Sequence, residues 1–418
     1  MASQTSTPSV CSDSPLSRQP TPIDLSLAEI AKEGLIITAC EKGDLATLVH
    51  LATSTHGLVS DSLRRTAWPL LLACEATDED TTQWQHLPAH REEGQVGLDV
   101  NRAFVYYPKH NSETELDRRK HELSSVILEV LRRHPALSYF QGYHDIVQVF
   151  YLVLGTGAAP QAAARLSLLR IRDFMLSSLD PAIAQLELLR PLLREADPIL
   201  YEHLPKSSAT FALAGTITMF AHNIQEYKDI TRLFDFFLAR HAVMPLYFFA
   251  AVVLSRREEL LEIGKEEEDI LHVVLSKLPE PFDIEFHIAR SVELYQRLPP
   301  GSLGSWEWWR ISSSSVLKTS ATLDDIQRLT LEDGERLFAQ QEKEVRRQQY
   351  QKKVVQQATR SIRHAKVRLW YYRRYGAVGL AIVVSAYALW LGKNGGPDFT
   401  SYPLFGYMGD LVQQFLGA

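Results

Sequence analysis

Two short groups of polar residues have the types and spacing needed to assist the transfer of a phosphoryl group. Asp99 and Arg102 form the first group, in a V-x-x-D-x-x-R pattern that begins at Val96. Tyr139 and Gln141 form the second group, in the run YFQG. An arginine can neutralise the charge on a transferring phosphoryl group, and a glutamine can orient the attacking water. Each group alone is weak evidence, but together they describe one mechanism.

The spacing of the first group suggests how its arginine is held. If the motif starts a helix, Asp99 and Arg102 are three residues apart and lie on the same side. The carboxylate can then hold the guanidinium in a fork-like pair. The competing interpretation is a solvated surface pair that contributes little. Gln141 follows a helix that Pro135 closes, so we expect it on a turn from which its side chain can reach a partner.

The composition limits the function classes. The 418 residues are 45% hydrophobic and 22% charged, with a formal net charge of -6, which is typical of a globular protein and argues against a nucleic-acid binder. The three cysteines, Cys11, Cys40 and Cys74, are far apart and predict neither a disulfide framework nor a zinc site. The histidines lack the spacing of metal ligands, so we expect no metal site.

The elements that must position these groups are helical. Residues 1–22 contain 13 Ser, Thr or Pro and are predicted to be disordered. Residues 23–56 are predicted to form accessory helices. Over residues 57–310 apolar side chains recur at intervals of three and four, and alternating patterns of useful length are missing, so this region is predicted to be an all-α domain.

Residues 57–310 resemble the TBC domain of Rab GTPase-activating proteins. Val96, Asp99 and Arg102 match the I-x-x-D-x-x-R motif of that family, and Tyr139 and Gln141 match its Y-x-Q motif. The resemblance also includes three other segments: the opening Gly57-Leu58 with the R-x-x-x-W helix from Arg64 to Trp68, residues Thr216 to Phe220, and residues Arg232 to Asp235. The order and spacing of these segments agree with the family.

The resemblance implies a two-subdomain helical fold and a dual-finger mechanism. Arg102 would act as the arginine finger, and Gln141 would place the attacking water in place of the Rab's own glutamine. Asp99 and Tyr139 would orient these two groups. GTP and Mg²⁺ would be bound by the Rab partner, so the chain would need no cofactor of its own. It would activate an enzyme rather than turn over a substrate itself.

This chain departs from the family pattern near the second motif. Ser138 stands where a Gly is common, and Tyr143 and His144 stand where Met and Asn are common. Ala103 follows the predicted finger where Thr is common. These changes leave both finger side chains in place and affect the shape of the surface that would face the Rab.

The C-terminal part has the pattern of a membrane anchor. Residues 311–374 are predicted to be a linker and a basic polar helix, either a solvated spacer or a weakly patterned coiled coil. Residues 375–392 carry no charge and are predicted to be a transmembrane helix, because a helix satisfies its backbone polar groups internally. Its 18 residues span about 27 Å, near the thickness of the endoplasmic reticulum bilayer.

Charges beside the segment predict its orientation. Ten Lys or Arg and no acid lie between Val345 and Arg374, whereas Lys393 is the only basic residue after the segment. The positive-inside rule then places the N-terminal part in the cytosol and the short tail, residues 393–418, in the lumen. A buried core helix and a membrane hairpin are the alternatives to a single span.

Three functions fit these patterns. The first is a GTPase activator for a Rab of early secretory traffic, anchored at the endoplasmic reticulum membrane and acting on the GTP form. The second is a membrane-anchored scaffold that binds a Rab without activating it. The third is a structural membrane protein that uses the helical domain as a platform. The presence of both finger residues favours the first, and the sequence does not name the Rab.

Overall fold

The computed structural model describes residues 26–74, 83–109, 112–205 and 209–393, without the side chains of residues 369, 374, 391 and 392. Within these ranges the chain forms helices joined by turns, and none of the described residues is in a strand. The all-α prediction is therefore confirmed for the described residues. The predicted disordered segment, residues 1–22, and the predicted tail beyond Lys393 lie outside them.

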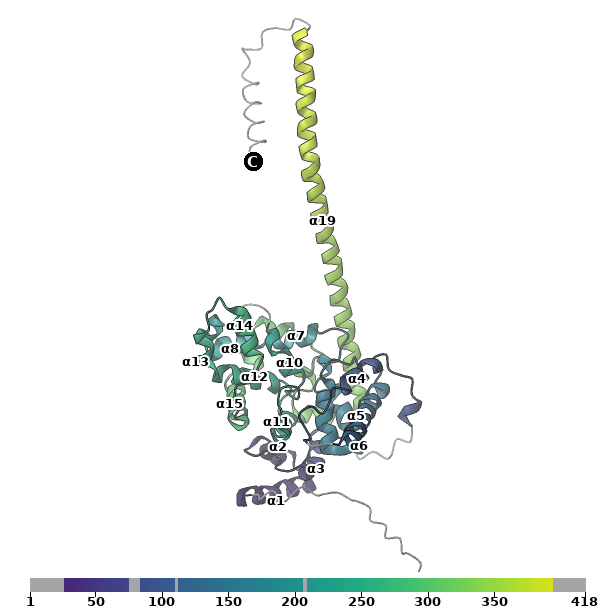
Figure 1. Ribbon diagram of the computed structural model, residues 1–418, viewed down its shortest axis with the longest axis vertical. Helices are drawn as coiled ribbons and strands as arrows, with labels where there is room; N and C mark the ends of the chain where they lie inside the picture. Colours follow the sequence, from purple (N-terminus) through teal and green to yellow (C-terminus); the bar gives the residue numbers. More distant parts are fainter. Residues whose placement is uncertain (1–25, 75–82, 110–111, 206–208, 394–418) are drawn as a thin grey trace, which may run out of the picture. The chain divides into compact units, whose positions relative to one another are not determined.

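The chain divides into two compact units, residues 1–346 and residues 347–418. The first part of unit 1 contains the accessory helices and the helices around the two motifs. These are α1 (Leu27–Lys42), α2 (Leu45–Thr53), α3 (Asp61–Leu71), α4 (Glu93–Val100), α5 (Glu113–Arg133) and α6 (Tyr143–Leu169). Figure 1 shows α4, α5 and α6 gathered at one side of unit 1.

Shorter helices make up the rest of unit 1. They are α7 (Asp180–Leu186), α8 (Leu189–Ala196), α9 (Pro198–His203), α10 (Leu213–Ile217), α11 (Tyr227–Ala239), α12 (Met244–Ser255), α13 (Arg257–Glu262), α14 (Glu268–Leu275), α15 (Ile284–Arg297), α16 (Trp306–Arg310), α17 (Val316–Thr319) and α18 (Leu323–Arg328). Short 3₁₀ turns η1 to η4 lie at Trp84–His86, Arg172–Phe174, Thr210–Ala212 and Pro300–Ser302. Helix α12 packs on α8 and α15, on the side away from α4 to α6 (Figure 1).

One hydrophobic core runs through unit 1, and α6 and α12 are largely buried in it. Helix α6 is long and apolar enough to cross a membrane by length and composition, but 61% of its apolar window is buried, which is typical of a core helix. The short apolar stretch in α12 is buried too, as we expected for a core segment. Trp68 joins the two sides of this core, with its ring 5.5 Å from Phe150 and 6.0 Å from Phe234.

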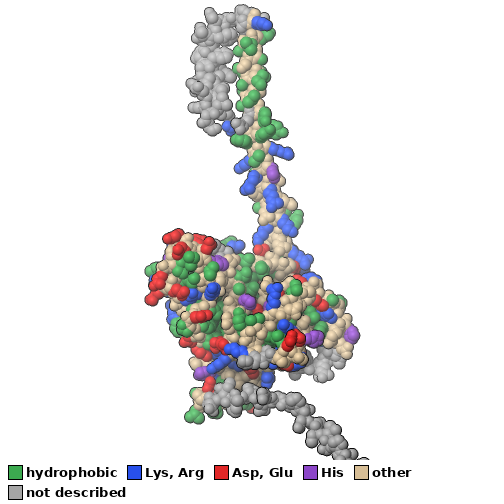
Figure 2. All heavy atoms as spheres, viewed as in Figure 1, with side chains coloured by type: hydrophobic (Ala, Val, Ile, Leu, Met, Phe, Trp, Pro, Cys, Tyr) green, Lys and Arg blue, Asp and Glu red, His purple; other side chains and the backbone are tan. Residues whose placement is uncertain are grey.

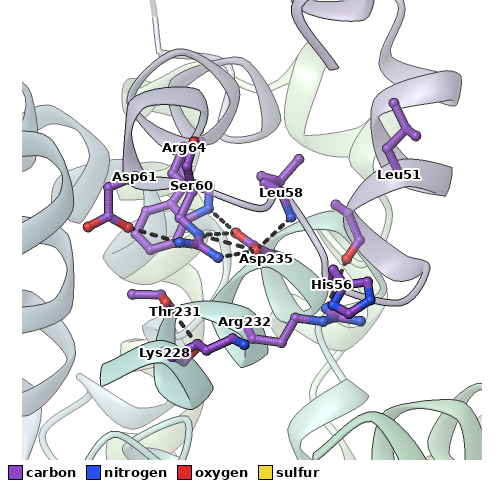
Figure 3. A network of polar contacts seen from close by, with 12 residues as sticks. Leu51, His56, Leu58, Ser60, Asp61, Arg64, Lys228, Thr231, Arg232 and Asp235 are labelled. Carbon is purple, nitrogen blue, oxygen red and sulfur yellow. Dashed lines mark hydrogen bonds and ion pairs between the residues drawn. The ribbon is translucent and has the colours of Figure 1, made fainter. Parts of the chain in front are cut away.

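A buried carboxylate links α3 to α11 (Figure 3). Asp235 is fully buried and forms a fork-like pair with the Arg64 guanidinium, with Nη2 at 3.0 Å from Oδ2. Its oxygens also accept hydrogen bonds from Trp68 Nε1 at 2.8 Å and from the Leu58 backbone N–H at 2.9 Å. Arginine and tryptophan four residues apart lie on one helix face, so both members of the R-x-x-x-W pattern reach the same acceptor. A buried charge is tolerated when it is paired and hydrogen-bonded in this way.

The glycine that opens the domain fits closely beside this network. Gly57 has a φ of 53° in the left-handed region, where glycine is favoured. A Cβ at this position would lie 2.5 Å from Asp235 Oδ2 and 2.9 Å from Arg232 Cδ. The neighbouring Arg232 guanidinium pairs with Glu285, with Nε at 2.7 Å from Oε1. The absence of a side chain at Gly57 therefore lets the turn approach two buried ionic groups.

Residues 311–346, which we expected to be linker and spacer, belong to the first compact unit. The carboxylate of Asp173 in η2 accepts hydrogen bonds from the Val316 N–H at 3.1 Å and from Gln341 Nε2 at 3.0 Å. Phe338 and Val345 are buried against the core. The serine-rich composition suggested a linker, but this segment supplies hydrogen-bond donors to a buried carboxylate. The structure thus ends the first unit at Arg346 rather than near residue 310.

A single helix, α19 (Leu331–Lys393), continues into the second unit. Within residues 347–393, Lys and Arg side chains cover the first part and apolar side chains cover the second part (Figure 2). The apolar segment is helical, and large side chains such as Leu380, Ile382 and Val383 are 64–66% exposed. Residues 375–392 are therefore a helix as predicted. That this helix crosses a membrane stays a prediction.

Candidate functional site

The first motif ends a helix instead of starting one. Helix α4 runs from Glu93 to Val100, so Asp99 lies in its last turn and Arg102 lies two residues beyond its end. The Arg102 backbone N–H donates to the Asp99 carbonyl at 2.9 Å, and the Ala103 N–H donates to the Val100 carbonyl at 3.0 Å. Ala103 is buried, whereas the Arg102 side chain is exposed. The turn therefore fixes the backbone of Arg102 and presents its side chain outward.

Asp99 supports this site through contacts that we did not predict. Its carboxylate is 3% exposed and accepts hydrogen bonds from Gln95 Nε2 and from the Tyr139 hydroxyl, both at 2.9 Å. No ion pair between Asp99 and Arg102 is found among the described residues. The expected fork-like pair is therefore wrong for this structure, because Arg102 lies beyond the helix end and the i, i+3 alignment of a helix no longer applies.

The Tyr139 hydroxyl is what brings the two motifs together. This hydroxyl donates a buried hydrogen bond to Asp99, which lies 40 positions earlier in the chain. Burial, reinforced by the hydrogen bond to the Asp99 carboxylate, raises the pKa of Tyr139 above its usual value. The phenol therefore keeps its proton and acts as a donor to Asp99. Because Arg102 follows Asp99 by three residues and Gln141 follows Tyr139 by two, both predicted finger residues lie close in the chain to one hydrogen-bonded pair.

A second set of contacts fixes the turn before Gln141. The Tyr139 backbone N–H donates to Glu92 Oε2 at 2.5 Å. The Arg91 guanidinium donates to the Leu137 carbonyl at 3.1 Å and to Ser138 Oγ at 2.8 Å. Ser138, which replaces a common glycine of the family, thus has a partner here. Residues just before α4 therefore hold the segment that carries the second motif.

Gln141 is exposed between two constrained neighbours. Phe140 is buried, and Gly142 adopts a φ of 101° as it starts α6. A Cβ on Gly142 would lie only 2.6 Å from Thr218 Cγ2. Tyr143, the next residue, is fully buried and its hydroxyl lies 2.7 Å from Ser167 Oγ. The turn is therefore fixed on both sides of the exposed glutamine.

Exposed apolar side chains flank the predicted arginine finger. Leu98 is 58% exposed, Val105 is 73% exposed and Tyr106 is 40% exposed. The segment between them is held from α6, because the Phe104 N–H donates to Gln148 Oε1 at 2.9 Å. Exposed apolar groups around a rigid polar site are a common feature of protein interfaces. These three residues were not singled out from the sequence, because exposure of an apolar side chain is decided by the fold.

The structure thus places the four predicted site residues in two roles. Asp99 and Tyr139 are buried and bonded to each other, while Arg102 and Gln141 are exposed. Sequence reasoning missed Gln95, although its spacing of four from Asp99 within a helix was a usable signal. It noted His144 as a departure from the family and as one of the histidines without metal-ligand spacing, and it assigned His144 no contact. Among the described residues, no group of three or more His, Cys, Asp or Glu could hold a metal ion.

Comparisons with known proteins show the family to which this chain belongs. The family model "Rab-GTPase-TBC domain" matches residues 61–261, a range that includes both motifs and the Arg64–Asp235 network. An all-helical domain with these two linked motifs is a TBC domain, and the chain belongs to the TBC-domain family of Rab GTPase-activating proteins. The family assignment made from the motifs is therefore confirmed.

Individual relatives show the extent of the similarity. The chain is 36% identical to TBC1 domain family member 20 of Bos taurus, over 63% of this chain and 66% of that protein. It is 32% identical to GTPase-activating protein gyp10 of Schizosaccharomyces pombe, over 66% of this chain and 75% of that protein. The matched region thus spans slightly less than two thirds of the first relative.

Among solved structures, the Ypt/Rab-GAP domain of Gyp1p aligns with 63% of this chain and 99% of its own length, with a TM-score of 0.49 and 14% sequence identity.

Proposed function

We propose that this protein stimulates GTP hydrolysis by a Rab GTPase, to which it supplies Arg102 and Gln141 in trans. The observation that carries the proposal is the hydrogen bond between Tyr139 and Asp99, which links the two motifs and leaves both finger side chains exposed. Arg102 would neutralise charge on the γ-phosphoryl group, and Gln141 would orient the attacking water. The Rab in its GTP form would contribute the nucleotide and Mg²⁺, so this chain needs no cofactor and has no turnover of its own.

The surface around the fingers supports a protein partner. Leu98, Val105 and Tyr106 would be covered when the Rab docks, which would exclude water around the phosphoryl group. Arg102 lies between these apolar residues along the chain, and a dry site strengthens the electrostatic effect of an arginine. The apolar side chains would provide binding, and Arg102 and Gln141 would act on the transition state.

The location that we propose is the endoplasmic reticulum membrane, with the TBC domain in the cytosol. Residues 375–392 would form a single C-terminal span, and the basic residues before it would stay on the cytosolic side. The exposed apolar side chains of this helix support such a span, because apolar side chains favour lipid over water. Confinement to the membrane that carries the lipidated Rab raises the effective concentration of the activator. Because of this location, we propose that the protein acts on a Rab of early secretory traffic.

The activity is tested with the full-length protein in detergent and a panel of GTP-loaded Rabs. We expect strong stimulation of one or a few Rabs. An arginine finger raises the rate of hydrolysis by about 10³-fold or more. Arg102→Ala is therefore expected to lose nearly all stimulation, and Gln141→Ala is expected to lose most of it. Exposed residues of α15 provide matched controls, Arg297→Ala and Gln296→Ala, which should retain the wild-type rate.

Two results would contradict the activator. GTP-dependent Rab binding without stimulation would favour the scaffold alternative. Stimulation that survives Arg102→Ala would mean that another group neutralises the phosphoryl charge. Loss of stimulation in Arg102→Ala and Gln141→Ala, together with the wild-type rate in both α15 variants, would support the dual-finger mechanism. The Rab that is stimulated would then be identified as the partner.

The anchor is tested separately by alkaline extraction of membranes. Leu380→Arg with Val383→Arg should release the protein, because each arginine in a membrane centre costs roughly 2.5–3.5 kcal/mol. Val354→Arg with Val355→Arg makes the same change in the basic part of α19 and should leave the protein in the membrane fraction. Retention of the Leu380/Val383 variant in the membrane fraction would refute the span.

The structural alternative is tested by deleting the residues beyond Asp398. Altered membrane shape after this deletion, with unchanged stimulation of GTP hydrolysis by the Rab, would favour that alternative.

A further inference from the structure

His144 lies directly behind the support of both predicted fingers. It is buried in the first turn of α6. Its Nδ1 lies 3.2 Å from the Tyr139 hydroxyl and 3.9 Å from Asp99 Oδ2, and its Nε2 lies 3.3 Å from Asp145 Oδ1. The other oxygen of Asp145 lies 3.0 Å from Nδ1 of His222. The Tyr139–Asp99 pair is therefore one end of a longer chain of polar groups that leads to a partly exposed histidine.

The donors and acceptors in this chain determine where its protons must lie. The Tyr139 hydroxyl has one proton, which it donates to Asp99. Its oxygen can then only accept from Nδ1 of His144, and the Asp145 carboxylate can only accept from Nε2. The Nδ1 contact is a hydrogen bond only when Nδ1 carries a proton, and the Nε2 contact is an ion pair with Asp145 only when both ring nitrogens carry one. A neutral His144 has a proton on only one of its two ring nitrogens. The lone pair of the other nitrogen then faces a lone pair of the Tyr139 oxygen or of the Asp145 carboxylate, which is unfavourable.

Charged groups on every side act on this proton. Asp99 faces His144 from α4 and Asp145 faces it from α6, while His222 faces it from the turn after α10. Burial lowers the pKa of His144, the Asp145 and Asp99 carboxylates raise it, and His222 lowers it, with a net result below the usual value. The hydrogen bond to Asp145 raises the pKa of His222. The doubly protonated form of His144 is therefore favoured as the pH falls.

We propose that His144 is a positioning residue for the two-finger site and that its second proton holds Tyr139 and Asp99 in the active arrangement. With this proton, the hydrogen bonds from Asp99 through Tyr139 to His144 continue into the ion pair with Asp145. Without it, one contact is lost, and the turn that carries Gln141 is held less firmly against α4. The stimulated rate would then respond to the pH at the membrane surface. This inference rests on the proposed activator function.

The kinetic test uses the full-length protein and the Rab that it stimulates best. His144→Leu removes both ring nitrogens. We expect kcat to fall about 10-fold to 100-fold with KM little changed, because misplacing a catalytic group has an effect of this size. His144→Asn keeps a polar side chain that does not titrate, so its activity should be intermediate. The ratio of wild-type to His144→Asn kcat should fall as the pH rises from 5.5 to 8, and the Rab's own pH dependence cancels in this ratio.

A second measurement does not depend on a Rab. Side-chain ¹⁵N labelling of histidine reports the protonation of each ring nitrogen. His144 should change from one protonated nitrogen to two as the pH falls, and Tyr139→Phe should lower the midpoint because it removes the acceptor of Nδ1. His50→Leu, an exposed change on α2, should leave both the kinetics and the His144 titration unchanged.

The outcomes separate this inference from the proposed function. If Arg102→Ala abolishes stimulation while His144→Leu keeps the wild-type kcat, the positioning role is wrong and the activator stands. Parallel pH profiles for wild type and His144→Asn, or an unchanged titration midpoint in Tyr139→Phe, would overturn the role of the proton. A change confined to KM would assign His144 to Rab binding instead. If no Rab is stimulated by wild type, the proposed function itself fails.

Discussion

The hydroxyl of Tyr139 donates a hydrogen bond of 2.9 Å to Asp99 Oδ2, which joins two motifs that are 40 residues apart in the chain. Both groups are buried, and neither can exchange its partner for water. Asp99 has Gln95 as its other side-chain donor. The geometry of the Arg102 turn and of the Gln141 turn is thus coupled through one phenol.

Removal of this phenol is expected to weaken activity and stability together. Tyr139→Phe leaves the buried Asp99 carboxylate with one donor fewer, which costs roughly 1–3 kcal/mol of unfolding free energy. We expect the stimulated kcat to fall at least 10-fold, as is typical when a positioned group is displaced. Urea unfolding and Rab-stimulated hydrolysis measure the two effects.

Tyr151→Phe is the matched control for that change. Tyr151 lies on α6 and, like Tyr139, donates to a carboxylate, that of Glu122, at 2.5 Å. It should lose stability without losing kcat in a folded sample. Equal losses of kcat in both variants would show that Tyr139 acts only through stability.

Gly142→Ala should destabilise the turn that presents Gln141. The φ of 101° is unfavourable for alanine, and the new Cβ would meet Thr218 Cγ2 at 2.6 Å. Backbone strain of this kind costs roughly 1–3 kcal/mol. Thr218→Ser removes the clashing methyl group and keeps the hydroxyl, so the double variant should recover part of the loss, as measured by thermal unfolding.

Gly157→Ala provides the comparison for the glycine change. A Cβ at Gly157 would have no neighbour within 4 Å, and Gly157 lies just after the kink of α6 at Gly155, where alanine is favoured over glycine by at most about 1 kcal/mol. Stability should therefore stay the same or rise. If Gly142→Ala behaves like Gly157→Ala, the turn does not require glycine.

The Asp235 network is expected to be the most sensitive site for stability outside the finger turns. Asp235→Ala leaves the Arg64 guanidinium, the Trp68 indole N–H and the Leu58 N–H without their shared acceptor. Removing one partner of a buried ion pair costs roughly 3–5 kcal/mol. Urea unfolding should show this loss, whereas Asp117→Ala on the exposed face of α5 should stay within about 0.5 kcal/mol of wild type. Similar midpoints for both variants would contradict the role of the network.

Acid should destabilise the domain through His241. Burial and the nearby Arg170 guanidinium lower the pKa of His241 to about 4, and its Nδ1 accepts a hydrogen bond from the Val243 N–H at 3.1 Å. The unfolded state binds a proton near pH 6.5, so between about pH 6.5 and 4 it carries more protons than the folded state. Stability therefore falls as the pH falls through this window, by about 3 kcal/mol at its lower end.

Comparison of variants isolates this contribution from those of other histidines. His241→Asn keeps an acceptor for the Val243 N–H but does not titrate, so its unfolding free energy should fall less between pH 7 and pH 4.5. His121→Asn, an exposed change on α5, should keep the wild-type slope. Identical slopes in wild type and His241→Asn would show that His241 is protonated in the folded state.

The amino-acid sequence determined the helical class and the family, and it singled out four candidate site residues. Periodicity shows which residues face a core, and the spacing of Asp99, Arg102, Tyr139 and Gln141 is specific enough to indicate one chemistry. It also marked residues 375–392 as an apolar helix. These features depend on local order along the chain, which is why they can be read from one sequence.

Tertiary structure decided how the site is supported. Local spacing suggested that Asp99 holds Arg102, but the helix ends between them and Asp99 binds Tyr139 instead. The same holds for Arg64 and Trp68, whose shared acceptor is Asp235, and for residues 311–346, whose serines looked like a linker but which pack on the first unit. A buried polar group takes the partner that the fold brings within about 3 Å, and that partner is often far away in the chain.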